Sequence, residues 1–87
     1  MTRIAVVTGG TRGIGEAISM KLQEKGRRVI ANYGGNDDAA KAFSDRTGIE
    51  VRKWDVGDHT ACLDACAAIE DEFGPIDIMV NNAGITR

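Results

Sequence analysis

The feature that most constrains this chain is a repeated alternation of short apolar runs with segments of helical spacing. Residues 4–7 are continuously apolar and end at a glycine-containing turn, a pattern typical of a buried parallel strand. Further apolar runs follow, separated by segments whose apolar residues recur every three or four positions. Such alternation predicts β-α-β units with right-handed crossovers. We therefore predict an α/β fold, a three-layer Rossmann-type half with parallel sheet order 3-2-1-4 and helices on both faces.

The expected strands cover residues 4–7, 29–31, 49–54 and 76–80. The segments between these strands are predicted to be helices, and residue types at their ends agree with that prediction. Asn36 and Asp58 can each accept a hydrogen bond from a free N–H of a helix first turn. Gly26 and Gly48 suit the left-handed conformation that often follows a last turn. Gly74-Pro75 predicts the end of the third helix, because proline cannot continue it.

Each expected helix carries an apolar face, which should pack against the sheet. The third contains Cys62 and Cys66, four positions apart. This is not the C-x-x-C of redox or zinc sites, and we interpret both thiols as small apolar core groups. The three faces consist of Ile14, Ala17, Ile18 and Leu22; of Ala39, Ala40 and Phe43; and of Cys62, Ala65, Cys66, Ile69 and Phe73.

Composition limits the classes of protein to which the chain can belong. Its 87 residues allow one domain at most. The net charge of −2 argues against a nucleic-acid-binding protein, which would need a basic patch. No apolar run is long enough for a membrane span, and glycines follow the first apolar run too soon for a signal peptide. We expect a cytoplasmic protein without nucleic-acid or membrane partners, and no metal site around the single histidine, His59.

The turn after the first strand, Thr-Gly-Gly-Thr-Arg-Gly-Ile-Gly over residues 8–15, is the leading candidate for function. Glycines let the backbone N–H groups approach an anion closely, and the helix that begins there directs its N-terminal dipole at the same point. The general G-x-G-x-x-G pattern fails, because Ile18 stands where its last glycine belongs. The turn instead reads T-G-x-x-x-G-x-G, with Gly9, Gly13 and Gly15 as its three glycines.

Two more motifs occur in order at strand ends. Asp55-Val56 follows the third strand, and Asn81-Asn82-Ala83-Gly84 follows the fourth. Together with the glycine turn, these motifs resemble the short-chain dehydrogenase/reductase family, and the resemblance covers the whole chain. It implies that Asp55 accepts from the adenine amino group while Val56 lies against the ring, although Asp55 could simply cap the following turn. It also implies that Asn81 ties neighbouring strands.

The predicted cofactor is NADP(H). NAD-binding Rossmann folds place an acidic residue at the end of strand two, where this chain has Asn32-Tyr33. Arg12 could pair with a 2′-phosphate, or it could be a solvated turn residue. Tyr33 lies beside the adenine or is merely exposed. The resemblance places the backbone from Asn82 to Thr86 along the cofactor. The predicted binding residues are Gly9, Arg12, Gly13, Ile14, Gly15, Asn32, Tyr33, Asp55, Val56, Asn82, Ala83, Gly84, Ile85 and Thr86.

The residues that would carry the chemistry are not in this sequence. The family uses a Ser, a Tyr-x-x-x-Lys and a further Asn, whereas Tyr33 is followed four positions later by Asp37. Ser19 and Ser44 fall in expected helices. We therefore assign no catalytic residue, interpret residues 1–87 as the N-terminal NADP-binding part of one Rossmann domain, and expect them to be inactive and marginally stable alone.

Further segments look like the acetoacetyl-CoA reductase branch of the family, which serves polyhydroxyalkanoate synthesis. They are the Asn-Tyr turn at residues 32–33 and Lys-Trp-Asp-Val at residues 53–56. The resemblance implies an acyl-thioester substrate and a homotetramer for the complete enzyme. Two alternatives stay open: a 3-oxoacyl-acyl-carrier-protein reductase of fatty-acid synthesis, and a nucleotide-binding module without catalytic activity.

Overall fold

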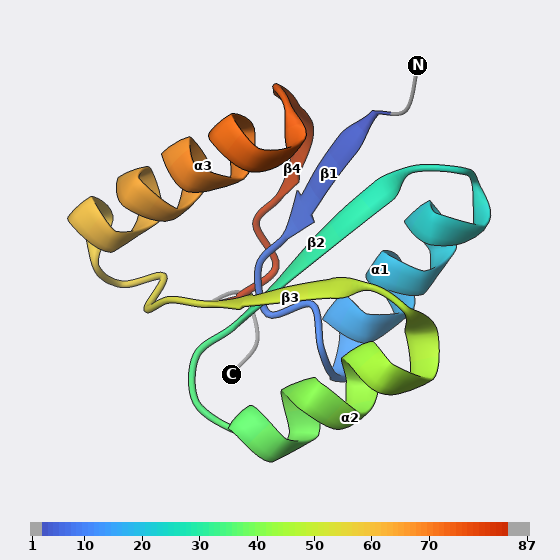
Figure 1. The fold of residues 1–87 in the computed structure, drawn as a ribbon. Coiled ribbons are helices and arrows are strands. Elements are labelled where there is room, and N and C mark those ends of the chain that lie inside the picture. The colour runs from blue at the N-terminus through green and yellow to red at the C-terminus, as the bar shows by residue number, and fades with distance from the viewer. Residues whose placement is uncertain (1–2, 84–87) are drawn as a thin grey trace.

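The computed structural model describes residues 3–83. A central parallel sheet is covered by helices on both faces, as Figure 1 shows. The predicted fold class is therefore confirmed. The elements alternate along the chain as β1 (Ile4–Val7), α1 (Gly13–Glu24), β2 (Arg28–Tyr33), α2 (Asp37–Thr47), β3 (Glu50–Lys53), α3 (His59–Phe73) and β4 (Ile76–Val80).

The strand order is β3-β2-β1-β4, with every neighbouring pair parallel. The order reverses between β1 and β4, and in folds of this kind ligands bind at the carboxyl ends of the strands beside such a reversal. The register between them shifts after Ile4. At that shift, the Asp77 carboxylate accepts a hydrogen bond of 3.2 Å from the Ile4 N–H. This side-chain bond satisfies a backbone donor at the irregularity in the ladder.

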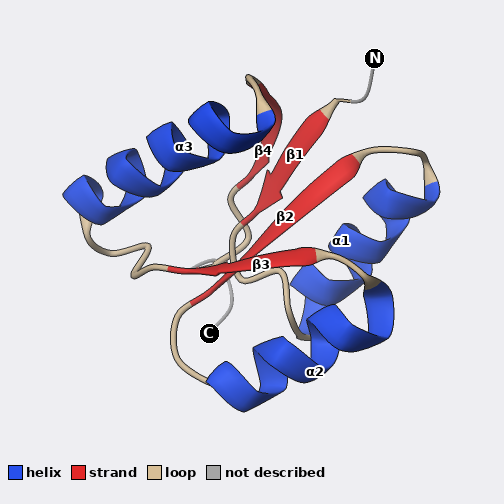
Figure 2. Ribbon diagram, viewed as in Figure 1, coloured by secondary structure: helices blue, strands red, loops and turns tan. Residues whose placement is uncertain are grey.

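Each face of the sheet carries its own core, and Figure 2 shows the helices that cover them. On the α3 side, buried Val6, Ile30 and Trp54 pack with Ile69 of the helix. On the other side, β-strand residues pack with Phe43 of α2, with Ile18 and Leu22 of α1 against them. The alternation of side chains along β1 and β2 explains this division, because successive residues of a strand point to opposite faces.

The predicted helix caps are confirmed for α2 and α3. The Asn36 side chain accepts from the Ala39 N–H at 2.9 Å, and the Asp58 side chain accepts from the Ala61 N–H at 3.0 Å. Gly48 ends α2 in the left-handed conformation, with φ of 76°. These caps begin α2 and α3 at the predicted residues, and Gly48 ends α2 shortly before β3.

Parts of the predicted apolar faces were wrong. In α1, Ile14 is 65% exposed and Ala17 is also exposed, whereas Gly15 and Ser19 are buried. The helix is rotated so that its small residues approach the turn after β1, and larger side chains could not come as close. In α2, Ala40 is buried as expected, but Ala39 is exposed.

The two cysteines of α3 are free and partly buried. Burial raises the pKa of the Cys66 thiol, with a smaller contribution from neighbouring Cys62. Cys62 also packs against the α3-side core. In residues 3–83 there is no group of histidine, cysteine and acidic side chains that could hold a metal ion, and no helix is both long and apolar enough to cross a membrane.

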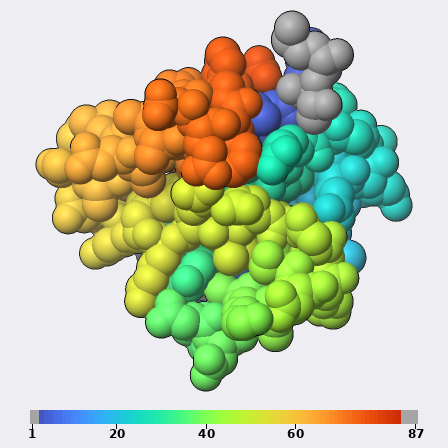
Figure 3. All heavy atoms as spheres, viewed as in Figure 1, coloured from blue at the N-terminus to red at the C-terminus, as the bar shows by residue number. Residues whose placement is uncertain are grey.

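The sheet edge formed by β3 lies at the surface between α2, in green, and α3, in orange (Figure 3). Arg52 on this edge pairs with Glu50 at 2.9 Å and with Glu72 of α3 at 2.8 Å. Arg28 and Arg52 both lie over the Phe73 ring, 4.6 and 5.4 Å from its centroid. Charged side chains thus cover this edge and reduce its tendency to pair with another strand.

Truncation of Phe43 should test the core beneath α2. Phe43 is 1% exposed, so Phe43→Ala removes a ring from a closely packed site and should lower the free energy of unfolding by about 3–5 kcal/mol. Lys41→Ala on the same helix removes an exposed side chain and should change it by less than about 0.5 kcal/mol. Chemical denaturation of the complete gene product measures both. Equal effects would show that the core is not packed as described.

Candidate cofactor-binding site

The candidate site lies at the carboxyl edge of the sheet, where the predicted functional turns follow their strands. The glycine turn leads from β1 into α1, and residues 34–36 lead from β2 into α2. Asp55 and Val56 follow β3, and Asn81 to Ala83 follow β4. In open α/β sheets, ligands bind at this edge, near the point where the strand order reverses.

The glycine turn requires glycine for two different reasons. Gly9 and Gly13 adopt φ of 62° and 59°, a region that side chains with a Cβ strongly disfavour. Gly10 and Gly15 are required because of close approach. A methyl group at Gly10 would lie 2.7 Å from the Ser19 hydroxyl oxygen, and one at Gly15 would collide with the Gly9 carbonyl oxygen. The turn therefore folds back onto the first turns of α1.

Hydrogen bonds join this turn to the segment after β4. The Thr8 hydroxyl oxygen accepts from the N–H groups of Asn82 at 2.9 Å and Ala83 at 3.1 Å. The same hydroxyl donates to the Val80 carbonyl at 3.3 Å. The Asn82 side-chain amide donates to the Gly9 carbonyl at 3.3 Å. We expected Asn81 to tie the strands, but within residues 3–83 these bonds come from Asn82, while Asn81 is exposed.

The N-terminus of α1 differs from those of α2 and α3. Arg12 occupies its N-cap position in an extended conformation, and its side chain makes no capping hydrogen bond. In α2 and α3, Asn36 and Asp58 provide such caps. The first N–H groups of a helix otherwise lack partners and carry the positive end of its dipole. An uncapped first turn behind a glycine-rich loop is the arrangement that binds phosphate groups.

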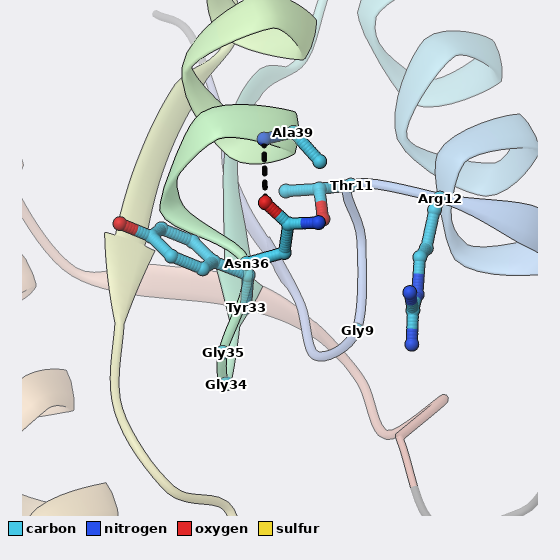
Figure 4. Close-up of a pocket in the computed structure, with 8 residues that line it drawn as sticks. All are labelled: Gly9, Thr11, Arg12, Tyr33, Gly34, Gly35, Asn36 and Ala39. Atoms are coloured by element: carbon cyan, nitrogen blue, oxygen red, sulfur yellow. Dashed lines mark hydrogen bonds between the residues drawn. The ribbon is translucent and has the colours of Figure 1, made fainter.

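A pocket of about 190 Å³ opens between the glycine turn and the turn after β2. Figure 4 shows the side chains of Thr11 and Asn36 facing each other across it, while Arg12 extends separately from the glycine turn. Two of the expected residues, Gly9 and Arg12, come together here with Tyr33. The other lining residues were not among the predicted binding residues, although three of them lie in the two turns that the sequence marks as functional; they are Thr11, Gly34, Gly35, Asn36 and Ala39.

Among residues 3–83, Arg12 is the charged residue that lines this pocket, and no acidic residue of that range lines it. The first carboxylate after β2, that of Asp37, is engaged elsewhere. It accepts a hydrogen bond of 3.0 Å from the Tyr33 hydroxyl and lies 3.3 Å from the Lys53 ammonium. The Tyr33 hydrogen bond, and then Lys53, lower the pKa of Asp37, and the same carboxylate raises the pKa of Tyr33. The pocket is therefore suited to an anion.

Asn32 does not lie where the sequence analysis placed it. We expected it to line the cofactor site, but it is 2% exposed and its side chain points into the protein. The side-chain oxygen accepts from the Gly9 N–H at 2.9 Å, and the amide group donates to the Trp54 carbonyl at 3.0 Å. These contacts make Asn32 part of the framework beneath the glycine turn. Alternation along β2 places Asn32 on the same side of the sheet as Ile30, the α3 side, whereas Tyr33 lies on the α2 side and bonds to Asp37.

Asp55 and Val56 are exposed in the turn after β3. One carboxylate oxygen of Asp55 accepts from the Gly57 N–H at 2.8 Å, which is the turn-capping role that we kept as an alternative. The Cys62 thiol lies 3.5 Å from the Val56 carbonyl. Neither residue lines the pocket beside Arg12, and their contact with adenine stays a prediction.

Other expected residues fall into two groups. Gly13, Ile14 and Gly15 form the first turn of α1, as the motif predicts. Gly84, Ile85 and Thr86 lie outside the described residues. The two serines have structural hydrogen bonds. Ser19 donates to the Gly10 carbonyl at 3.0 Å, and Ser44 donates to the Ile49 carbonyl at 2.7 Å.

Comparison with known proteins agrees with this geometry. Residues 3–87 match the family described as short chain dehydrogenase. The chain therefore belongs to the short-chain dehydrogenase/reductase family, a class of oxidoreductases with a Rossmann fold.

The chain is also similar to individual reductases of this family. The chain is 58% identical to acetoacetyl-CoA reductases from Rhizobium meliloti and Paracoccus denitrificans over all 87 of its residues, which cover 36% of each relative. It is 38% identical to a 3-oxoacyl-[acyl-carrier-protein] reductase FabG from Staphylococcus aureus, again over its whole length and 37% of that relative. A solved structure of a "putative 3-oxoacyl-reductase" from Bacillus thuringiensis superimposes with a TM-score of 0.90 at 27% identity, covering 97% of this chain and 37% of the other.

Gly15→Ala should test the close packing of the turn. The added methyl group would collide with the Gly9 carbonyl, so the backbone must shift, and the free energy of unfolding should fall by about 1–3 kcal/mol. Gly34→Ala is the matched control, because its methyl group would meet open space. Denaturation of the complete gene product without ligand measures both. A Gly15→Ala variant as stable as the Gly34→Ala variant would contradict the described turn.

Proposed function

We propose that this chain forms the NADP(H)-binding part of an acetoacetyl-CoA reductase, which reduces the 3-oxo group of acetoacetyl-CoA in polyhydroxyalkanoate synthesis. The observation that carries the cofactor proposal is the pocket between the glycine turn and the β2–α2 turn. Arg12 is the charged lining residue in the described part of the chain, and Asp37 is bound to Tyr33 and Lys53. A 2′-phosphate meets a guanidinium there without a competing carboxylate.

We propose a place in this site for the pyrophosphate, the 2′-phosphate and the adenine of such a nucleotide. The uncapped first turn of α1 would receive the pyrophosphate, and Gly13, which begins that turn, has no side chain to obstruct it. Thr11, Arg12 and Asn36 would surround the 2′-phosphate. Val56, which is 39% exposed, would contact the adenine, with Asp55 beside it. When bound, NADPH supplies a hydride for carbonyl reduction.

The choice of acyl carrier rests on similarity. Identity of 58% to acetoacetyl-CoA reductases, against 38% to the FabG reductase, favours coenzyme A over acyl-carrier protein. An assay of the complete gene product with both thioesters distinguishes them. A higher kcat/KM for the acyl-carrier-protein substrate would favour the FabG-like function, and no turnover of either, with nucleotide still bound, would favour a binding module without catalysis.

The rest of the proposed enzyme involves residues beyond this sequence. No Tyr-x-x-x-Lys occurs in these 87 residues, which span 36% of the acetoacetyl-CoA reductase from Rhizobium meliloti, and we propose that the proton donor lies in a longer product. We propose that this product is a cytoplasmic homotetramer. Size measurement by light scattering tests the assembly.

Removal of Arg12 should change cofactor preference. In the complete gene product, Arg12→Ala should weaken NADPH binding by roughly ten-fold or more, because it removes a hydrogen-bonded charge partner of the 2′-phosphate. NADH binding should change far less. Arg3→Ala, which removes an exposed arginine that immediately precedes β1, controls for loss of general charge. Fluorescence titration with both nucleotides measures the ratio, and equal losses for the two would refute the assignment of Arg12.

Substitutions at Asp55 should separate its two roles. Asp55→Ala removes both the bond to Gly57 and the proposed adenine contact, and should raise the KM for cofactor with little change in kcat. Asp55→Asn keeps an oxygen for the Gly57 N–H, so it should restore the turn but not the second acceptor. Steady-state kinetics and thermal unfolding follow the two effects. A fall in kcat at unchanged KM would show that Asp55 does not hold the adenine.

A further inference from the structure

Asn32 is a buried polar side chain that the proposed function does not use directly. It lies near the end of β2 and is 2% exposed. Its side-chain oxygen accepts from the Gly9 N–H at 2.9 Å. Its amide nitrogen donates to the carbonyl groups of Trp54 at 3.0 Å and Tyr33 at 3.4 Å. Its own carbonyl accepts from the Gly10 N–H at 3.0 Å. Every one of these partners is a backbone group.

Only a side chain that carries a donor and an acceptor on the same terminal carbon satisfies this set of partners. The Gly9 N–H requires an oxygen, and the Trp54 carbonyl requires an N–H, so the orientation of the amide is determined by its partners. An aliphatic side chain would leave both backbone groups buried without partners. A carboxylate would satisfy Gly9 but would place a negative charge against the Trp54 carbonyl, in surroundings that already disfavour a charge.

The bonds of Asn32 connect separate parts of the candidate site. Gly9 begins the glycine turn, and its carbonyl also accepts from the Asn82 side chain at 3.3 Å. Trp54 immediately precedes Asp55 and is 7% exposed in the α3-side core. The Asn32 side chain thus holds the glycine turn after β1 and the adenine-proximal turn after β3 at a constant separation, across the end of β2.

We propose that Asn32 is a positioning residue that sets the glycine turn for the pyrophosphate and does not determine cofactor preference. It is one of the two residues, Asn32 and Tyr33, at the end of β2, where NAD-dependent Rossmann folds place the ribose-binding acid. This inference rests on the proposed nucleotide-binding function. Preference between the two nucleotides belongs instead to the residues that line the pocket, Arg12 and Asn36 among them.

Two asparagine-to-aspartate substitutions in the complete gene product test the proposal as a matched pair. Asn32→Asp should weaken NADPH and NADH binding by a similar factor, roughly ten-fold or more, because a buried carbonyl loses its donor. Asn36→Asp keeps an oxygen to cap α2 but places the same charge in the pocket, so it should weaken NADPH selectively. A gain in NADH affinity for Asn32→Asp would overturn the proposal.

The pH dependence of the Asn32→Asp variant gives a second measurement. Burial raises the pKa of a carboxyl group, and the protonated form presents a donor and an acceptor, as an amide does. The variant should therefore bind both nucleotides best at low pH and lose affinity as pH rises through the raised pKa. The wild-type protein, measured over the same range, is the reference. A ratio of variant to wild-type affinity that is constant with pH would count against the role of Asn32.

Hydrogen–deuterium exchange separates failure of this inference from failure of the proposed function. In the wild-type protein without nucleotide, the Gly9 and Gly10 amides should exchange slowly, because Asn32 accepts from both. If the wild-type protein binds neither nucleotide but these amides are protected, the proposed function is wrong and the framework role of Asn32 stands. Rapid exchange at both amides in the wild-type protein overturns the role, even where the substituted protein does not fold.

Discussion

The arrangement of the candidate site depends on one peptide group, that of Gly9, which is fixed from both sides. Its N–H donates to the Asn32 side chain at the end of β2, and its carbonyl accepts from the Asn82 side chain after β4. Gly15 approaches the same carbonyl so closely that no other residue fits there. Through these contacts the Gly9 peptide group joins the ends of β2, β1 and β4 to the start of α1. The conformation of the turn between β1 and α1 is therefore closely restricted.

Much of the fold could be predicted from the sequence because it depends on local chemistry. The apolar runs of β1 and β4 are bounded by turn residues and occur over the predicted residues, and Asn36 and Asp58 cap the predicted helices. The rotation of α1 could not be predicted in this way. The spacing of apolar residues placed Ile14 on the buried face of α1, but Ile14 is 65% exposed. The close approach of Gly15 to the Gly9 carbonyl determines instead which face of α1 is buried.

The same limit explains what was missed at the site. The glycine motif indicated the turn itself, because its spacing reflects backbone requirements that are local. The inward direction of Asn32 and the part that Asn82 plays depend on partners 23 and 73 residues away in sequence. A side-chain amide is chemically able to contact a ligand or to satisfy buried backbone groups, and residue type alone does not distinguish the two.

The acidic residue closest in sequence to the end of β2, Asp37, has its carboxylate bound outside the pocket. Asp37 and Asp38 both lie in the first turn of α2, close in sequence to the end of β2, where a carboxylate would compete with a bound phosphate. The Tyr33 hydroxyl and the Lys53 ammonium draw the Asp37 carboxylate toward β3. The acid still stabilises the helix dipole in that position. Tyr33 lines the pocket, and its hydroxyl binds the Asp37 carboxylate outside the pocket. In this way a pocket lined by Arg12 on one side of the β2–α2 turn is compatible with acidic residues in the first turn of α2 on the other side.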